Sequence, residues 1–217
     1  MIYKAIITAG GTSSRFGNSN KLLEKINDKE IIKYTVEAFL QTNIDEIIIC
    51  ANSSIIDVLK KMFDCERVKI VEGGNSRQQS VYNGLVAANG CDYVLIHDGA
   101  RPLITPEIIL NTMRAVAEKK AVSVMTKTID TIKEVDENGK IIKTIDRSKL
   151  YNTQTPQAFE YDLITSVHEK FKDKSFTDDA GMAEASGYDV YIVEGDYSNI
   201  KVTTQTDIAL MKTYLNY

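Results

Sequence analysis

The 217 residues of the chain correspond to about 1.4 average domains, which favours one large domain over two complete ones. Hydrophobic residues make up 43% and charged residues 26%, which is ordinary for a folded globular protein and excludes intrinsic disorder. The net charge of −4 argues against a protein that wraps nucleic acid. A few cations placed together can still bind a small anion on an acidic body.

Cysteine usage and hydropathy indicate a cytoplasmic protein. The chain has three cysteines without C-x-x-C spacing and only two histidines, so no zinc site is expected. The longest unbroken apolar run, 47–51, is far too short to cross a membrane. No signal-peptide pattern or lipidation motif occurs, so we expect no membrane partner.

Short apolar runs, rich in β-branched residues, predict strands that are buried on both faces. In chain order they cover 4–9, 46–51, 68–72, 93–97, 121–126 and 190–194. Residues at helical spacing predict helices around 31–39, 58–63 and 81–88, and Thr105-Pro106 predicts the start of another. This alternation predicts a doubly wound, mainly parallel α/β sandwich, which we assign to a single domain over 1–217.

A hairpin interrupts this alternation. Segments 131–135 and 140–145 flank Asp136-Glu137-Asn138-Gly139, whose Asn-Gly pair is typical of a hairpin turn. A hairpin inserted into a parallel fold projects from it, so we predict an arm at about 129–150. Such an arm contacts another subunit or covers a site more often than it forms a domain.

The first predicted strand runs into a glycine loop, Thr8-Ala9-Gly10-Gly11-Thr12-Ser13-Ser14-Arg15-Phe16-Gly17. A loop of small residues at the carboxyl end of a strand exposes backbone N–H groups that suit phosphate oxygens. Neither the G-x-G-x-x-G pattern nor the P-loop pattern is present, but Arg15 and Lys21 supply two cations where a polyphosphate would lie. The alternative is a tight turn with two solvated cations.

Two later strands also end in polar turns. Gly73-Gly74 precedes a predicted helix that begins near Ser76 or Arg77, and a plain loop capped by Ser76 fits equally well. In His97-Asp98-Gly99-Ala100-Arg101-Pro102, Asp98 is placed to meet a metal–phosphate complex, or else to pair with Arg101 and shape a turn. We expect His97 to be packed in the strand rather than to act as a base.

Taken one by one, the remaining motifs are weak: Thr177 before two acids predicts a helix cap, and Arg147 alone is typical of a surface charge. The whole series, in order from Ala9 to Asp207, resembles the 2-C-methyl-D-erythritol 4-phosphate cytidylyltransferases of the non-mevalonate isoprenoid pathway. The motifs that complete the resemblance are Asp130-Thr131-Ile132-Lys133, Asp146-Arg147, Gln154-Thr155-Pro156-Gln157, Thr177-Asp178-Asp179 and Asn199-Ile200-Lys201.

The resemblance implies transfer of CMP from CTP to 2-C-methyl-D-erythritol 4-phosphate, with Mg²⁺ as cofactor and a homodimer formed through the arm. It implies that Arg15 and Lys21 contact the triphosphate and that Arg147 and Lys201 orient the acceptor phosphate. Ser13 stands where the family has a glycine. The implied nucleotide-side residues are Ala9, Gly10, Gly11, Thr12, Ser13, Gly73, Arg77, Ser80, Asp98 and Gly99, and the implied acceptor-side residues are Asp98, Arg101, Thr131, Thr155 and Thr177.

Other functions remain as alternatives. Ribitol-5-phosphate cytidylyltransferases share the glycine loop and the Gln-Thr-Pro-Gln and Asn-Ile-Lys motifs, although the blocks at 97–102 and 146–148 are nearer to the methylerythritol group. Sugar-1-phosphate nucleotidyltransferases match the second half poorly. A nucleotide-binding module without turnover would need only the loop cations, and an oxidoreductase would need the dinucleotide pattern.

Overall fold

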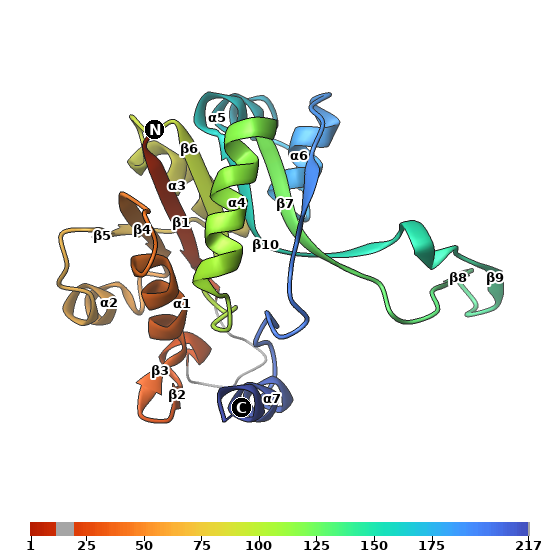
Figure 1. Cartoon of the computed structure of the whole chain (residues 1–217), viewed down its shortest axis with the longest axis horizontal. Helices are drawn as coiled ribbons and strands as arrows, with labels where there is room; N and C mark the ends of the chain where they lie inside the picture. Colours follow the sequence, from red (N-terminus) through yellow and green to blue (C-terminus); the bar gives the residue numbers. More distant parts are fainter. Residues whose placement is uncertain (12–19, 217) are drawn as a thin grey trace.

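The computed structural model describes residues 1–11 and 20–216. Within these residues a seven-stranded sheet forms the centre, in the order β11-β7-β10-β6-β1-β4-β5 (Figure 1). Six of these strands match the predicted runs to within one residue at each end. The strands are β1 (Tyr3–Ala9), β4 (Glu46–Ala51), β5 (Val68–Glu72), β6 (Tyr93–Asp98), β7 (Ala121–Lys127), β10 (Tyr151–Glu160) and β11 (Tyr191–Glu194).

The seventh strand, β10, corrects the sequence analysis, which predicted no strand there. It lies between β6 and β7 and runs antiparallel to both, whereas the other neighbouring pairs are parallel. Three of its buried residues, Gln154, Thr155 and Gln157, are polar, and they interrupt the continuous apolar pattern of a buried strand. The register with β7 shifts between Thr153 and Gln157, around Pro156, which has no N–H to donate.

Helices cover both faces of the sheet, as predicted for a doubly wound fold. Successive strand residues point to opposite faces, so Ile6 and Ile48 pack in one apolar layer and Ile7 and Ile49 in the other. The layer of Ile7 is covered by α1 (Ile31–Leu40), α2 (Ile56–Met62) and α4 (Pro106–Lys119), and the layer of Ile6 by α3 (Arg77–Ala87), α5 (Tyr161–Lys170) and α6 (Asp179–Ala185).

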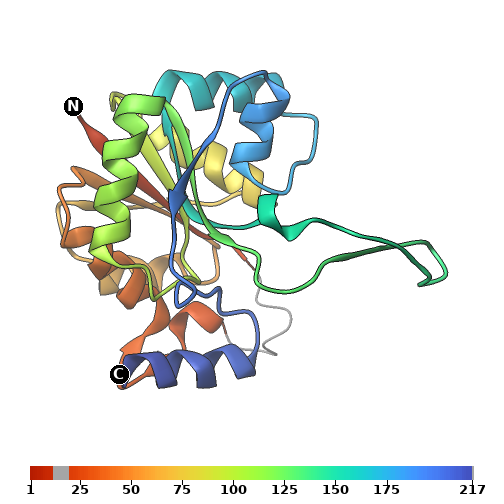
Figure 2. The same cartoon turned by 45° about the vertical axis from the view of Figure 1, so that its right-hand side comes forward.

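A small group of elements closes one end of the molecule. It comprises η2 (Lys21–Leu23), the short strands β2 (Lys25–Ile26) and β3 (Lys29–Glu30), and the last helix, α7 (Gln205–Leu215). Figures 1 and 2 show α7 beside these strands, with the C-terminus far from the N-terminus. Among all the helices of the described ranges, none is long and apolar enough to cross a membrane.

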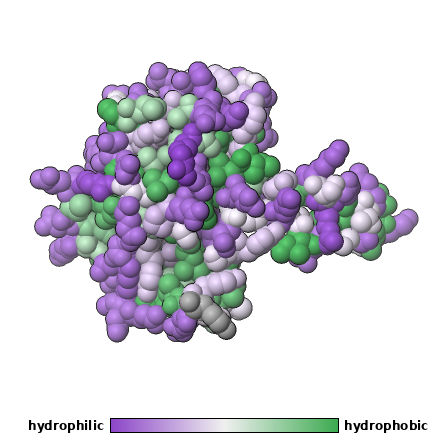
Figure 3. Space-filling view, viewed as in Figure 1, coloured by the Kyte–Doolittle hydropathy of each residue, from purple (hydrophilic) through white to green (hydrophobic). Residues whose placement is uncertain are grey.

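The predicted hairpin is present and forms an arm. Strands β8 (Lys133–Val135) and β9 (Ile141–Thr144) pair antiparallel, and the arm points away from the sheet in Figures 1 and 2. The Asp136 carboxylate accepts hydrogen bonds from the N–H groups of Asn138 and Lys140 and so closes the turn. Every residue of β8 and β9 is exposed, and Figure 3 shows separate apolar patches on the arm among hydrophilic residues.

Candidate active site

The candidate site lies where β1 and β6 end side by side. Thr8 of β1 is paired with Asp98, the last residue of β6, and polar side chains from four further segments meet here around a cavity of about 320 Å³. Six of the lining residues were predicted from the sequence. The lining consists of Arg77, Asp98, Arg101, Thr153, Gln154, Thr155, Gln157, Thr177, Asp178 and Lys201.

Asp98 is the electrostatic centre of the cavity. Its side chain is buried, and one carboxylate oxygen lies 2.8 Å from Nζ of Lys201 and 3.6 Å from Nε of Arg101. The other oxygen accepts a hydrogen bond of 3.3 Å from Nε of Arg77. Burial would raise the pKa of Asp98, but the three cations, Lys201 foremost, hold that pKa far below its ordinary value. Asp98 therefore stays ionised and holds three cationic side chains close together at the cavity.

Hydrogen bonds fix the backbone at Asp98. The N–H of Asp98 donates to the hydroxyl of Thr155 at 3.1 Å, and that hydroxyl lies 2.9 Å from Nδ1 of His97. Nε2 of His97 faces the carbonyl of Arg101 at 3.2 Å, and a carbonyl only accepts, so Nε2 carries the ring proton. Nδ1 of the neutral ring then accepts from Thr155. Burial lowers the pKa of His97 to about 4, and its complete burial confirms the packed position in the strand that was expected from the sequence.

The segment that carries Lys201 is tied to β10. Asn199 is fully buried, and its amide donates to Oε1 of Gln154 at 3.2 Å and to the carbonyl of Thr155 at 3.0 Å. Nη1 of Arg101 donates to the Asn199 carbonyl at 2.8 Å. Lys201 therefore extends from a fixed backbone toward Asp98, which explains why these motifs occur together.

Ser80 joins the two glycine turns. Its hydroxyl accepts a 2.9 Å hydrogen bond from the N–H of Gly74 and donates to the carbonyl of Ser76 at 2.9 Å. A Cβ on Gly10 would lie 2.8 Å from this hydroxyl oxygen, and one on Gly73 would lie 3.0 Å from it. The end of β1 and the turn after β5 thus meet closely, as their joint assignment to the nucleotide predicted.

Several predicted nucleotide residues lie around this junction. Ala9 ends β1, and a Cβ on Gly99 would approach the carbonyl of Thr8 to 2.9 Å, so glycine is needed there. Lys21 lies in η2, and its ammonium group donates to the carbonyl of Val202 at 2.8 Å, beside Lys201. The predicted residues Thr12, Ser13 and Arg15 lie outside the described residues, and Gly11 is exposed at their border.

Two predicted acceptor residues are not part of the cavity. Thr131 and Arg147 lie at the base of the arm and are exposed, and the guanidinium of Arg147 donates to the carbonyl of Ile129. The structure therefore does not bring Arg147 together with Lys201 within one chain. Motif order alone carries no distances, so this separation could not be predicted from the sequence.

The helix start near Thr177 also differs from the prediction. Asp178, not Thr177, caps α6, because its carboxylate accepts a hydrogen bond of 3.1 Å from the N–H of Gly181. Thr177 instead lines the cavity. By contrast, the predicted Ser76 cap of α3 is confirmed by a 3.0 Å bond from the N–H of Gln79.

Three buried polar residues at or behind the cavity wall, Gln157, Asp179 and His168, were not predicted as site residues from the sequence. Oε1 of Gln157 accepts from the N–H groups of Asp179 and Ala180 at 3.0 and 3.1 Å, which anchors α6 to β10. Asp179 bonds Nη1 of Arg77 at 2.8 Å and faces Nε2 of His168 at 3.0 Å. Gln157 and Asp179 lay in the motifs of the resemblance, whereas His168 gave no signal because it is one histidine on an ordinary amphipathic helix.

The side chains available as ligands limit how a metal ion could be held. No group of three or more histidine, cysteine, aspartate or glutamate side chains that could hold an ion occurs in 1–11 or 20–216. Mg²⁺ in phosphate-transfer sites uses one or two carboxylates together with substrate phosphates and water, not a protein cage.

Comparisons with known proteins point to one family. Residues 3–217 match the family described as 2-C-methyl-D-erythritol 4-phosphate cytidylyltransferase. A protein of that name from Caldanaerobacter subterraneus is 41% identical over 225 residues, covering 99% of both chains. One from Clostridium botulinum is 41% identical over 220 residues, covering 98% of both.

Solved structures show the same fold. The crystal structure of 4-diphosphocytidyl-2C-methyl-D-erythritol synthase from Anaerococcus prevotii is similar with a TM-score of 0.90 and 34% identity, over 100% of this chain and 99% of that one. A 2-C-methyl-D-erythritol 4-phosphate cytidylyltransferase from Thermus thermophilus has a TM-score of 0.80 at 22% identity, covering 98% of both chains, which is a likeness of fold alone.

Proposed function

The chain belongs to the 2-C-methyl-D-erythritol 4-phosphate cytidylyltransferase family, and we propose that it transfers CMP from CTP to 2-C-methyl-D-erythritol 4-phosphate in isoprenoid precursor synthesis. An oxygen of the acceptor phosphate attacks the α-phosphorus of CTP, a new P–O bond forms, and the bond to the leaving pyrophosphate breaks. The acceptor phosphate is already deprotonated near neutral pH, so no side-chain nucleophile is needed. Catalysis then consists of in-line positioning and stabilisation of charge.

The convergence of cations from distant segments on one edge of the sheet carries this proposal. Both reactants are polyanions, and their mutual repulsion is the first obstacle to the reaction. Lys21 and Lys201 are held beside each other, since Lys21 bonds the carbonyl of the residue that follows Lys201. We assign Lys21, with Arg15, to the triphosphate and Lys201 to the acceptor phosphate.

We propose that Mg²⁺ accompanies CTP, bound mainly by phosphate oxygens and water. Mg²⁺ loses its water reluctantly and commonly reaches such sites together with a nucleotide. When bound there, it would neutralise charge that develops on the leaving pyrophosphate. The backbone N–H groups of the glycine turns and the Lys21 ammonium would then orient the triphosphate.

We also propose a homodimer in which the arm of one chain serves the site of the other. The arm carries Arg147 and Thr131 away from the cavity of its own chain, and its strands have no core of their own. Exposed apolar side chains on the arm offer a surface for another copy. They are Ile129, Ile132, Val135, Ile141 and Ile142, which are 38% to 62% exposed.

A cytoplasmic location accords with this chemistry. Cys50, Cys65 and Cys91 are all free, as a reducing compartment keeps thiols. CTP is an intracellular substrate, and the described residues include no membrane-crossing helix.

The first test is release of pyrophosphate by the protein with CTP and Mg²⁺. The assay is run in parallel with 2-C-methyl-D-erythritol 4-phosphate and with ribitol 5-phosphate. Release with the first acceptor alone is expected. Release with ribitol 5-phosphate alone would retain the chemistry but replace the substrate, and no release with either would contradict the proposed function.

A further inference from the structure

A series of hydrogen-bonded polar side chains runs from α5 to the cavity. Nε2 of His168 lies 3.0 Å from Oδ1 of Asp179. The other oxygen of Asp179 accepts a hydrogen bond of 2.8 Å from Nη1 of Arg77. Nε of the same guanidinium donates at 3.3 Å to Asp98, which holds Lys201. One arginine therefore joins two carboxylates, of which one faces the cavity and one faces His168.

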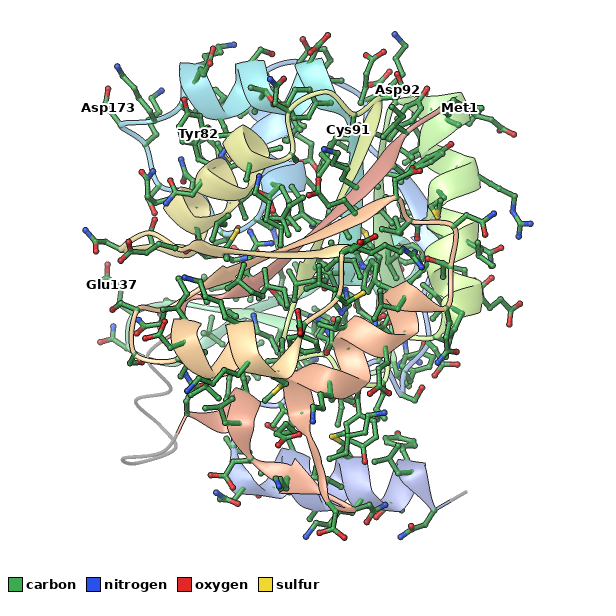
Figure 4. All side chains as sticks on the ribbon, turned by 90° about the vertical axis from the view of Figure 1, so that its left-hand side faces the viewer. Met1, Tyr82, Cys91, Asp92, Glu137 and Asp173 are labelled. Atoms are coloured by element: carbon green, nitrogen blue, oxygen red, sulfur yellow. The ribbon has the colours of Figure 1, made fainter. Side chains whose placement is uncertain are left out.

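The geometry leaves each member of this series few alternatives. Asp179 is 1% exposed and His168 is 2% exposed, so neither can replace a lost partner with bulk water. The Asp179 carboxylate accepts only, so Nε2 of His168 donates to it. Tyr82 on α3 stacks on the imidazole with ring centroids 6.5 Å apart, and Figure 4 shows α3 beside α5.

We propose that His168 is a positioning residue for the transfer reaction, acting through Asp179 and Arg77 on Asp98. This inference rests on the proposed function and extends it to a residue that touches neither substrate. The hydrogen bond from Nε2 of His168 fixes the rotamer of Asp179. Asp179 then holds the guanidinium of Arg77 in the plane in which its Nε points at Asp98. Arg77 leaves the second oxygen of Asp98 to Lys201.

Loss of the His168 donor should loosen this series without removing any cavity residue. Asp179 would keep Arg77 but would gain rotational freedom, and Arg77 would then divide its hydrogen bonds unevenly between the two carboxylates. A distant substitution that misplaces a reacting or positioning group by about 1 Å can lower the rate by about 100-fold. We expect a decrease in kcat/KM of about tenfold, since Gln157 still anchors the backbone of Asp179.

The test compares two substitutions of His168, one that removes the N–H donor and one that keeps an N–H donor in a smaller side chain. His168→Leu keeps an apolar volume without a donor, whereas His168→Gln places an amide N–H near the position of Nε2. We expect His168→Leu to lose about tenfold in kcat/KM and His168→Gln to recover most of it. Val167→Ala, on the same helix and 1% exposed, is the control that lowers the melting temperature but leaves kcat/KM unchanged.

A second measurement does not depend on turnover. The Nε–Hε signal of Arg77 in a ¹H–¹⁵N spectrum, assigned by its absence in Arg77→Lys, reports the bond to Asp98. It should shift or broaden in His168→Leu and return in His168→Gln. An unchanged signal, or full activity of folded His168→Leu, would overturn the proposal. Wild-type protein that releases no pyrophosphate would instead contradict the proposed function, and the spectrum would still decide the role of His168.

Discussion

The ammonium group of Lys201 lies 2.8 Å from the carboxylate of Asp98, and the two side chains differ sharply in exposure. The Asp98 side chain is 9% exposed and that of Lys201 is 41% exposed. On the proposed assignment, Lys201 can therefore turn toward the acceptor phosphate, while Asp98 stays paired with Arg77 and Arg101. Asp98 thus acts as the fixed anion that keeps cations at the cavity before substrates arrive.

The first prediction concerns the charge of Asp98. Asp98→Asn keeps the size of the side chain but leaves three cations without their common anion. Removing one partner of a buried charge pair costs about 3–5 kcal/mol, so the free energy of unfolding should fall by an amount of that order. Pyrophosphate release should fall at least about 100-fold, because Lys201 and Arg77 lose their orientation.

Thermal unfolding and steady-state kinetics check this prediction. Asp64→Asn, at an exposed position, is the matched control and should change neither quantity. Normal turnover of Asp98→Asn would show that the cations are held by other contacts.

The second prediction assigns Lys21 to the transition state. Lys21→Ala should lower kcat about 100- to 1,000-fold, because a contact to developing charge contributes about 3–4 kcal/mol. The affinity for CTP should change much less, since other groups bind the ground state. Presteady-state transfer and CTP binding measured on the same variant separate the two effects.

The control for Lys21 is a lysine in the next element. Lys25 lies on β2 with a side chain that is 60% exposed, and its ion pair with Glu30 spans 3.6 Å on the surface. Lys25→Ala should retain wild-type kcat. If Lys21→Ala turned over normally, Lys21 would have no part in catalysis.

The fold could be predicted because it has strong local signals, whereas cavity residues such as Thr155 and Lys201 were predicted only through the family resemblance. Continuous apolar runs marked the parallel strands, and glycine turns with polar residues marked their carboxyl ends. The strand β10 was not predicted from the sequence, because several of its buried side chains, such as Thr155 and Gln157, are polar. Their hydrogen bonds are satisfied only by segments distant in sequence, and no local pattern carries that information.

Positions that depend on long-range geometry also could not be predicted from the sequence. Arg147 and Lys201 share a predicted role, yet only Lys201 lines the cavity, because Arg147 follows β9 of the arm. His168 gave no signal, because its importance depends on a partner on another helix, Asp179.

The third prediction tests whether Arg147 serves a partner's site. Arg147→Ala should raise the KM for the acceptor and leave the KM for CTP almost unchanged, because arginine binds phosphate through two parallel hydrogen bonds. At an acceptor concentration far below the raised KM, Arg147→Ala is nearly silent, and mixing it with the slow variant Lys21→Ala then separates the two arrangements.

In a mixed dimer, one of the two sites would combine Lys21 of the Arg147→Ala chain with Arg147 of the Lys21→Ala chain. Random pairing of equal amounts would restore on the order of a quarter of wild-type activity. If Arg147 acts within its own chain, every site keeps one defect and mixing restores nothing. Kinetics of the mixture after unfolding and reassociation give the answer.

The fourth prediction concerns the arm as a dimer contact. Ile142 is 58% exposed on β9, and Ile142→Asp places a charge in the apolar surface that we assign to a second copy. The variant should sediment as a monomer where the wild type is a dimer. Val86→Asp, at a position 61% exposed on α3, is the control and should leave the dimer intact. A dimer unaffected by Ile142→Asp would place the contact elsewhere.

The fifth prediction follows from the buried neutral ring of His97. Burial lowers its pKa to about 4, whereas the unfolded chain titrates near the ordinary value of about 6.5. Between these values the unfolded state binds more protons than the folded state, so the free energy of unfolding falls as the pH falls. Over this window the contribution amounts to about 3 kcal/mol, and it is fully present only above about pH 6.5.

His97→Asn isolates this contribution. The amide oxygen can still accept from the Thr155 hydroxyl, but the side chain no longer titrates. The variant should be less stable at pH 7, because the bond to the Arg101 carbonyl is lost, and its stability should fall less steeply between about pH 6.5 and 4. Urea unfolding of both proteins at several pH values measures the two slopes. Equal slopes would mean that His97 titrates normally in the folded protein, and the hydrogen-bond chain from His97 through Thr155 to Asp98 would then be wrong.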